Sequence, residues 1–193
     1  MRYDAEHKQR TKERVLHEAA QAIRQFGPDK IGVAGLMAKA GLTVGGFYAH
    51  FKSKDDLIAQ AISHMFDERA QVFQGCMKCV EPAQALRSFV DVYLSAQHRD
   101  RRERGCPLPA LSGDLARMPA VARKRFEAGV RRMTDSIADL LKRIGQPAPD
   151  ELAASIVSEM VGAIVLARAV PSAELSARIL EGARDQIKRR ANL

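Results

Sequence analysis

Apolar residues recur at intervals of three and four along most of the chain, which is the spacing of one face of an α-helix. From about residue 8 to residue 26 this stripe includes Val15, Ala19 and Ile23, and Gly27-Pro28 then ends the helix. The alternation of apolar and polar residues that indicates β-strands is missing from the sequence. The pattern therefore predicts an all-α protein.

A short helix and a glycine turn are predicted over residues 33–43. The apolar face of this helix comprises Val33, Leu36, Met37 and Ala40. Gly41 can end it because glycine adopts the left-handed conformation at low cost, and Thr43 is expected to cap the next helix through its side-chain oxygen. Two helices joined by such a turn are typical of a DNA-binding helix-turn-helix.

The second helix of this motif contains Gly45-Gly46, where each glycine costs roughly 1 kcal/mol relative to alanine. Missing side chains suit a backbone that approaches the wall of a major groove, whereas the alternative is an ordinary loop. Phe47 and Phe51 favour the helix, since residues four apart share a face and can anchor it in a core. Tyr48 and His50 are expected to point elsewhere.

The rest of the chain predicts a larger helical domain. Ser53 to Asp56 has the pattern of a capping box, with Asp in place of Glu or Gln, and is expected to open a long helix. Further helices are expected over about 83–97, from 107, and over about 121–144, 150–170 and 172–190. We therefore divide the chain into a head over residues 1–52 and a helical domain over residues 53–193.

Residues 150–170 are apolar or small almost all round, and such a helix must be covered on every side. This indicates a subunit interface, at which the small residues Ala154, Ser158 and Gly162 would allow close approach. The alternative is a central helix wrapped by its own subunit. The most apolar run, residues 160–167, is bounded by charged residues and is too short to cross a membrane, so no membrane partner is expected.

Charge is unevenly distributed over the 193 residues, whose formal net charge is +8. Residues 1–54 carry ten Lys and Arg against five Asp and Glu, whereas residues 55–193 carry 21 against 18. A basic front end fits binding to a polyanion, although charge alone also fits a solvated surface. The charged amino terminus does not resemble a secretory signal, and three cysteines without one favour a reducing cytoplasm.

The first quarter of the chain resembles the TetR family of bacterial transcriptional regulators. The matching residues are Thr11-Lys12, Val15, Ala19, Ala20, Phe26-Gly27, Ala40-Gly41-Leu42-Thr43, Gly45, Phe47-Tyr48, Phe51, Ser53-Lys54 and Leu57. The resemblance implies a homodimer, usually a repressor that a small-molecule effector releases from palindromic operator DNA. It also implies that residues 53–193 bind the effector and dimerise through the last two helices.

The same resemblance assigns DNA contacts by position. It would place Thr43, Val44, Gly45 and Gly46 at the groove, and would bring Lys12, Tyr48, His50 and Lys54 to backbone phosphates. Gly32, Gly46 and His50 depart from residues common in the family. With two glycines and a valine at the groove, few side chains can contact bases, so specificity would rest on Lys39, Thr43 or DNA shape.

Cys106 is the sharpest chemical candidate outside the head. It lies between Gly105 and Pro107 at the expected start of a helix, where a thiolate is favoured, and several arginines precede it. The Gly-Cys-Pro-Leu stretch resembles a segment of a TetR branch that includes electrophile sensors of the NemR type. The alternative is an inert, buried cysteine.

Other candidates are less specific. Cys76 and Cys79 form a CxxC without a second ligand pair, the five histidines lack a spacing such as HxxxH, and we therefore expect no metal or other cofactor. An effector pocket could be lined by Phe89, Tyr93, Met133, Met160 and Arg168, which fit equally well in a core. We expect a regulator rather than an enzyme; a thiol redox protein and a helical interaction module are the alternatives.

Overall fold

The computed structural model describes residues 2–77 and 81–193, and every regular element within them is helical, as predicted. The head consists of α1 (Arg2–Phe26), α2 (Val33–Lys39) and the 3₁₀ helix η1 (Val44–Ala49). The elements that follow are α3 (Lys54–Met77), α4 (Pro82–Tyr93), α5 (Ala96–Asp100), η2 (Arg102–Arg104), α6 (Pro107–Leu111), η3 (Leu115–Arg117), α7 (Ala120–Arg143), α8 (Pro149–Ala169) and α9 (Ala173–Arg190).

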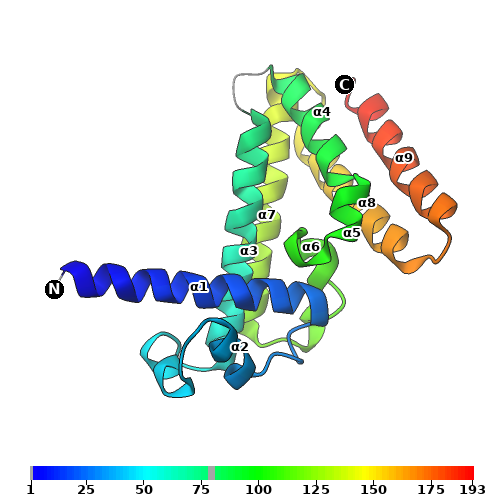
Figure 1. Ribbon diagram of the computed structural model, residues 1–193. Helices are drawn as coiled ribbons and strands as arrows, with labels where there is room; N and C mark the ends of the chain where they lie inside the picture. Colours follow the sequence, from blue (N-terminus) through cyan, green and yellow to red (C-terminus); the bar gives the residue numbers. More distant parts are fainter. Residues whose placement is uncertain (1, 78–80) are drawn as a thin grey trace.

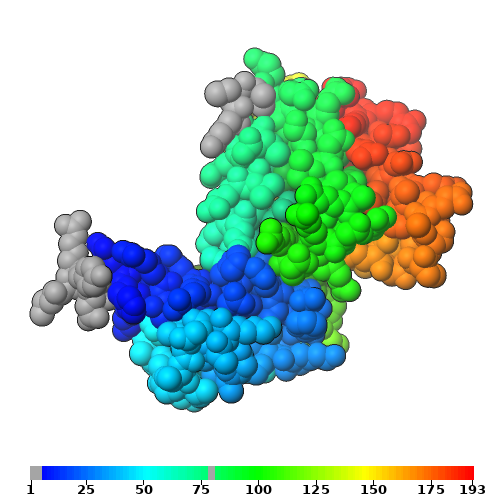
Figure 2. Space-filling model, in the orientation of Figure 1, coloured from blue at the N-terminus to red at the C-terminus, as the bar shows by residue number. Residues whose placement is uncertain are grey.

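Two long helices, α3 and α7, lie side by side and form the spine of the molecule (Figure 1). Helix α1 crosses one end of this spine, with α2 and η1 beneath it, while α8 packs on α7 and α9 packs on α8 (Figure 1). The head thus forms one end of the molecule, and α9 lies at the outer edge of the remaining helices (Figure 2). Because α3 starts in the head and continues along α7, it is the element that the two parts share.

The start of α3 confirms the predicted capping box. The Asp56 backbone N–H donates to Ser53 Oγ at 3.1 Å, and the Asp56 carboxylate accepts from the Lys52 backbone N–H at 2.9 Å. The return bond reaches one residue further back than in the usual box. These bonds fix the direction in which α3 leaves the head.

The second helix of the motif differs from the prediction in two respects. Residues 44–49 form a 3₁₀ helix rather than an α-helix, and the Thr43 side chain makes no capping hydrogen bond. The first hydrogen bond is instead made by the backbone, from the Gly46 N–H to the Thr43 carbonyl at 3.1 Å. Two glycines in six residues weaken an α-helix, and short segments readily adopt the tighter 3₁₀ form.

The helix expected over residues 83–97 is wrong at its carboxyl end. Helix α4 stops at Tyr93, and Ser95 begins α5 by accepting a hydrogen bond from the His98 backbone N–H at 3.1 Å. A serine N-cap competes with continuation of the helix because its oxygen satisfies a free backbone donor. The break turns His98 back toward the end of α4.

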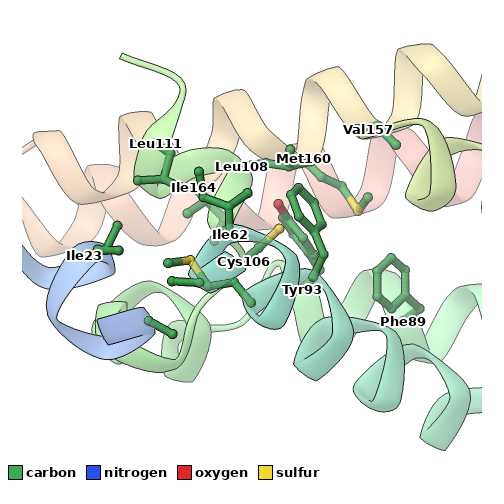
Figure 3. Packing of buried hydrophobic residues seen from close by; sticks show 14 of the residues in the cluster. Ile23, Ile62, Phe89, Tyr93, Cys106, Leu108, Leu111, Val157, Met160 and Ile164 are labelled. Carbon is green, nitrogen blue, oxygen red and sulfur yellow. The ribbon is translucent and has the colours of Figure 1, made fainter. Parts of the chain in front are cut away.

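One connected set of buried apolar side chains runs from the head into the rest of the chain. Figure 3 shows part of it, where Ile23 from α1 lies near Ile62 from α3 and where Tyr93, Cys106, Leu108 and Met160 meet. The head therefore shares its core with α3 and is not connected to it only by a flexible linker.

Helix α8 is covered on one face only. Its own subunit therefore does not surround it on every side, as the alternative of a central helix required. Its buried residues are Ala153, Ile156, Val157, Met160, Ala163, Ile164 and Ala167. Val165 and Leu166 are exposed, as are the small residues Ala154 and Ser158. By length and composition alone this 21-residue helix, of mean hydropathy 1.7, could cross a membrane, but its buried face packs against α6, α7 and α9, as in the core of a helical protein.

Candidate functional site

Two aromatic side chains hold η1 in the head. Phe47 and Phe51 are 2% and 1% exposed, and their ring centroids lie 5.5 Å apart. They belong to the same buried cluster as Val15 and Leu57. The predicted anchoring role of both phenylalanines is confirmed, and it fixes which side of η1 faces outward.

The turn before η1 has the geometry that glycine was expected to supply. Gly41 has a φ of +70°, its N–H donates to the Ala38 carbonyl, and the Leu42 N–H donates to the Met37 carbonyl. This pair of bonds is the Schellman arrangement, which ends a helix with a left-handed residue. These backbone bonds, together with the buried Phe47 and Phe51, fix the angle between α2 and η1.

The outward side of η1 presents few side chains, and the ring of Tyr48 packs edge-on against that of Phe47, with ring centroids 5.3 Å apart. Tyr48 is 76% exposed and Val44 is 50% exposed. A Cβ atom added at Gly45 would meet nothing within 4 Å, and the Thr43 hydroxyl is exposed and not used for capping. These four residues form the bare face of η1, a surface shaped for close approach of the backbone to another molecule.

Basic groups lie beside the bare face. The Lys12 Nζ lies 5.8 Å from the centroid of the Phe51 ring, and Lys39 is exposed at the end of α2. Lys54 is partly committed to its own chain, since its Nζ donates to the Asp29 carbonyl at 3.3 Å. The structure thus brings the basic residues predicted from sequence to one end of the molecule.

His50 is half-buried near this surface. Burial, followed by the charges of Lys8 and Lys12, lowers the pKa of His50 below 6.5. Its Nδ1 atom is buried and has no hydrogen-bond partner among the described residues. At neutral pH the imidazole is therefore mostly uncharged, and an anion beside it would oppose the effect of the two lysines.

A cavity of about 310 Å³ lies between α3, α4 and α7. It is lined by Phe66, Arg69, Ala70, Phe73, Gln74, Met77, Phe89, Tyr93, Cys106, Gly129, Arg132, Met133 and Ser136. Three of the residues that we expected in an effector pocket, Phe89, Tyr93 and Met133, are in this lining, together with Cys106, the candidate for chemical sensing. The sequence reasoning missed the whole contribution of α3, because the apolar stripe of that helix fits a core equally well.

Two expected pocket residues lie elsewhere. Met160 is fully buried in the core on α8 and is not among the cavity-lining residues. Arg168 donates to the carbonyls of His98 and Arg99 at 2.8 and 3.0 Å and so caps the end of α5.

Arg69 is the charged group of the cavity that sequence reasoning overlooked. Its Nη2 atom is buried and makes no hydrogen bond within the described residues, and no ion pair joins Arg69 to a described acid. Arg132, the other cavity arginine, is paired with Asp67 at 2.8 Å. The aromatic cavity therefore contains one guanidinium that lacks a counter-charge.

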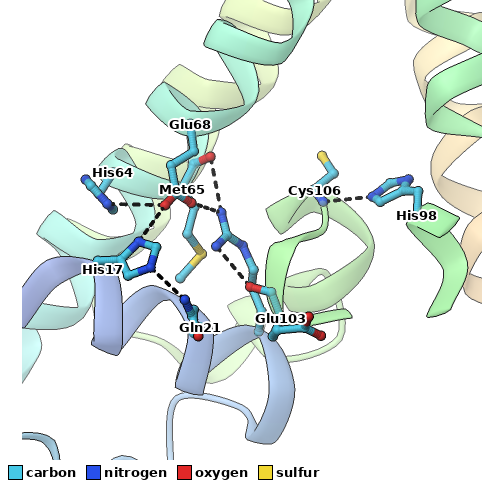
Figure 4. Close-up of polar contacts among 9 residues, drawn as sticks. His17, Gln21, His64, Met65, Glu68, His98, Glu103 and Cys106 are labelled. Carbon is cyan, nitrogen blue, oxygen red and sulfur yellow. Dashed lines mark hydrogen bonds and ion pairs between the residues drawn. The ribbon is translucent and has the colours of Figure 1, made fainter. Parts of the chain in front are cut away.

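Cys106 lies in the wall of the cavity and is held by His98. The Cys106 backbone N–H donates to His98 Nε2 at 2.9 Å, and His98 Nδ1 donates to the Tyr93 carbonyl at 2.6 Å (Figure 4). These bonds define the neutral imidazole, and burial together with the charge of Arg69 lowers the pKa of His98 to about 4. One side chain thus ties the end of α4 to the start of α6.

The expectation of a thiolate at Cys106 is contradicted. The residue is 1% exposed, and burial raises the pKa of its thiol, although the charge of Arg69 opposes the rise. Helix α6 has only five residues, so its dipole is too small to offset the loss of solvation. Cys76 is half-buried and burial also raises the pKa of its thiol, while Cys79 lies outside the described residues.

The buried Arg24 joins the head to α3. Its guanidinium donates to Glu68 Oε2 at 2.6 Å and to the Glu103 carbonyl at 3.2 Å (Figure 4). His17 and His64 contact the other oxygen of the same carboxylate. The absence of HxxxH in the sequence concealed this cluster, whose only local signal is the four-residue spacing of His64 and Glu68.

Comparison with known proteins agrees with this geometry. Residues 15–61 match the family of bacterial regulatory proteins, tetR family. Residues 82–181, just over half of the chain, match the C-terminal domain of LmrA/YxaF-like transcriptional regulators. No curated protein matches the sequence.

Solved structures share the fold over nearly the whole chain. A TetR transcriptional regulator from Chloroflexus aurantiacus is 25% identical, with a TM-score of 0.81 and coverage of 100% of this chain and 97% of that one. The reduced form of NemR from E. coli is 19% identical, with a TM-score of 0.81 over 93% and 95% of the two chains. Regulatory protein TetR from Rhodobacter sphaeroides is 21% identical, with a TM-score of 0.78 over 92% and 96%.

The first family match contains the helix-turn-helix with its bare outer face. The second match contains α4 and α7, which form the cavity together with α3. The chain belongs to the TetR family of bacterial transcriptional regulators, which bind DNA and respond to ligands.

Proposed function

We propose that this regulator is a cytoplasmic homodimeric repressor that reads a palindromic operator with the bare face of η1 and releases it when a small molecule occupies the α3–α4–α7 cavity. The observation that carries the proposal is the bare face itself. A side-chain-poor helix is anchored from behind by Phe47 and Phe51, while Val44 and Tyr48 are exposed and the space in front of Gly45 is open. Such a surface has a reason to exist only if another molecule approaches it closely.

In this proposal the residues of the head divide into two groups. Thr43, Val44, Gly45 and Gly46 lie at the major groove, where the valine methyls suit a thymine methyl and the threonine hydroxyl suits a base edge or phosphate. The phosphate contacts come from Lys12, Lys39, Tyr48, His50 and Lys54. Phosphate contacts fix the register of the protein on DNA, whereas base contacts select sequence.

The proposed dimer forms through α8 and α9. The open face of α8 combines small residues with exposed Val165 and Leu166, and Leu175 is exposed on α9. Burial of such a face against the same face of a second copy gives a two-fold interface. Two heads related in this way would reach successive major grooves, roughly 34–36 Å apart.

The effector that best fits the cavity is a mainly apolar, ring-containing molecule with one anionic group. Aromatic side chains from α3 and α4 would contact its body, and the unpaired guanidinium of Arg69 would hold its charge. Since Phe66, Arg69 and Phe73 stand on α3, a ligand that displaces them also displaces the helix that begins in the head. Release from DNA requires only that the ligand bind the two positions of α3 with different affinity.

Selection of preferred sites from random duplex DNA tests the proposal, with enrichment compared at two salt concentrations. We expect a palindrome whose half-sites lie about one helical turn apart, together with a steep fall in affinity as salt increases. Salt-sensitive binding without an enriched sequence would contradict the repressor proposal and favour a basic interaction module. The burial of Cys106 and the raised pKa of its thiol speak against a thiol-based sensor as the main function.

A further inference from the structure

Three ligating side chains converge where α1 meets α3. His17 comes from α1, and His64 and Glu68 come from α3, one helical turn apart. The His17 Nδ1 lies 3.1 Å and the His64 Nε2 lies 3.4 Å from the same carboxylate oxygen, Glu68 Oε1 (Figure 4). All three atoms lie within 4.8 Å of one another.

We propose that His17, His64 and Glu68 form a binding site for a divalent transition-metal ion, with Zn²⁺ as the best-matched ion, that bridges the head and α3. Two imidazoles and a carboxylate are a common ligand set for zinc, with water as the fourth ligand. Ligands 2.0–2.2 Å from a tetrahedral ion lie about 3.3–3.6 Å from each other. The distances from the carboxylate oxygen to the two imidazoles, 3.1 and 3.4 Å, are within about 0.2 Å of that range.

The surroundings fit a metal site in three respects. The His64 Nε2 is buried and makes no hydrogen bond within the described part of the chain, so it has a free position for a ligand bond. Arg24 occupies only Oε2 of Glu68 and leaves Oε1 to face the histidines. On the far side of the His17 ring, Nε2 lies 2.6 Å from the side-chain amide nitrogen of Gln21. With Nδ1 on the metal, the Nε2–H would donate to the Gln21 amide oxygen once that amide is turned over, and this bond would orient the ring.

The ion would have a route from solvent. The side chain of His17 is 51% exposed, and an open recess of about 360 Å³ is lined by His17, Gln21, Arg24, Glu68, Arg69, Val72, Glu103 and Arg104. The Glu68 carboxylate is paired with the guanidinium of Arg24 at 2.6 Å, which favours the charged form that a metal ligand needs. The site does not depend on the identity of the operator or effector.

Calorimetric titration of the chelator-treated full-length protein with ZnCl₂ tests the proposal. We expect one Zn²⁺ per wild-type chain and binding weakened at least tenfold in His17→Gln and in His64→Gln. Loss of a residue that only hydrogen-bonds to a metal ligand typically lowers metal affinity 10–100-fold, so loss of a ligand itself should lower it at least as much. His7→Gln is the matched control, because His7 is an exposed histidine on the same helix, and we expect it to bind as the wild type does.

Wild-type protein that takes up no stoichiometric Zn²⁺, or a His17→Gln variant that binds like the wild type, would overturn the proposal. Thermal unfolding without metal checks that each variant is folded. We expect His17→Gln to fold, because the side chain of His17 is exposed. Addition of ZnCl₂ should then raise the melting temperature of the wild type and of His7→Gln but not of His17→Gln. Glu68→Gln is unsuitable as the main test, since it also removes the ion-pair partner of the buried Arg24.

Discussion

Gly129 on α7 lies directly against the ring of Phe66 on α3, so that a Cβ atom at position 129 would fall 2.2 Å from two ring carbons. Phe66 cannot easily yield, because its ring also packs edge-on against Phe126 at a centroid distance of 5.7 Å. The close packing of the two spine helices at this level therefore requires glycine.

We expect Gly129→Ala to lower stability. Overpacking of a filled core costs about 1–3 kcal/mol, which outweighs the gain of up to ~1 kcal/mol from a better helix former. Thermal unfolding measures the change, with Gly75→Ala on α3 as control because a Cβ atom there meets nothing within 4 Å. A Gly129→Ala protein as stable as the control would show that Phe66 moves freely.

Gly45→Ala separates folding from DNA binding. The added methyl group meets no atom of the chain, and alanine favours a helix, so stability should stay equal or rise by up to ~1 kcal/mol. DNA affinity should nevertheless fall, because the methyl group occupies the space between backbone and groove. Gly75→Ala, far from the head, is again the control. Unchanged operator affinity in a titration would remove Gly45 from the proposed interface.

Tyr48→Phe tests the phosphate contact. The hydroxyl is removed from a side chain that is 76% exposed, so the fold should be unaffected. A hydrogen bond to a charged group contributes about 1.5–3 kcal/mol, which corresponds to a loss of affinity of roughly tenfold to a hundredfold. The loss should be similar for operator and random DNA, since phosphates carry no sequence. Equal affinity of variant and wild type in both titrations would contradict the assignment.

Stability should fall on acidification through His98. Its pKa is about 4 in the folded chain against 6.5 for the unperturbed group, so the unfolded chain binds the proton more readily. The contribution of neutral His98 to the free energy of unfolding is fully present above pH 6.5. It is lost as the pH falls toward 4, and its total is roughly 3 kcal/mol. Chemical denaturation between pH 7 and pH 4 measures it. His98→Gln should be less stable at pH 7 and should lack this part of the pH dependence; an unchanged slope would place the titration elsewhere.

Arg69→Met tests the chemistry of the cavity. Methionine keeps much of the apolar bulk of arginine but removes the unpaired charge. We expect an anionic aromatic ligand to lose at least tenfold in affinity for the variant, while an uncharged analogue of the same shape binds equally well or better. Calorimetry with such a matched pair of ligands gives the comparison. Equal losses for both ligands would indicate a packing effect rather than charge recognition.

Local rules were enough to predict the DNA-contacting head. Gly41 acts through neighbours within a few residues, and the four-residue spacing of Phe47 and Phe51 places both on one face, although the core that receives their rings also includes the distant Val15. Local rules failed at Ser95, where the apolar stripe runs on although the serine caps a new helix. They also failed where distant segments meet: nothing in the sequence brings His17 to Glu68 or separates Arg168 from the cavity. Whether the aromatic side chains of α3 face a core or a cavity depends on the size of the α7 side chains opposite them. The glycine at position 129 of α7 is one such position.

The bonds around His98 divide the cavity into a stiff wall and a yielding one. The imidazole ties Tyr93 to Cys106, and Arg168 fastens the end of α5, so the α4–α6 side resists displacement. The opposite wall is made of side chains packed between α3 and α7, which are joined by the exposed ion pair between Arg132 and Asp67, and exposed pairs of this kind contribute little to stability. In the proposed mechanism, a molecule too large for the empty space would displace α3 more readily than α4 or α6, and the head is built onto the start of α3. Ligand bulk would then set the position of the head, whereas the charge of Arg69 would decide which ligands of that bulk bind tightly enough to act.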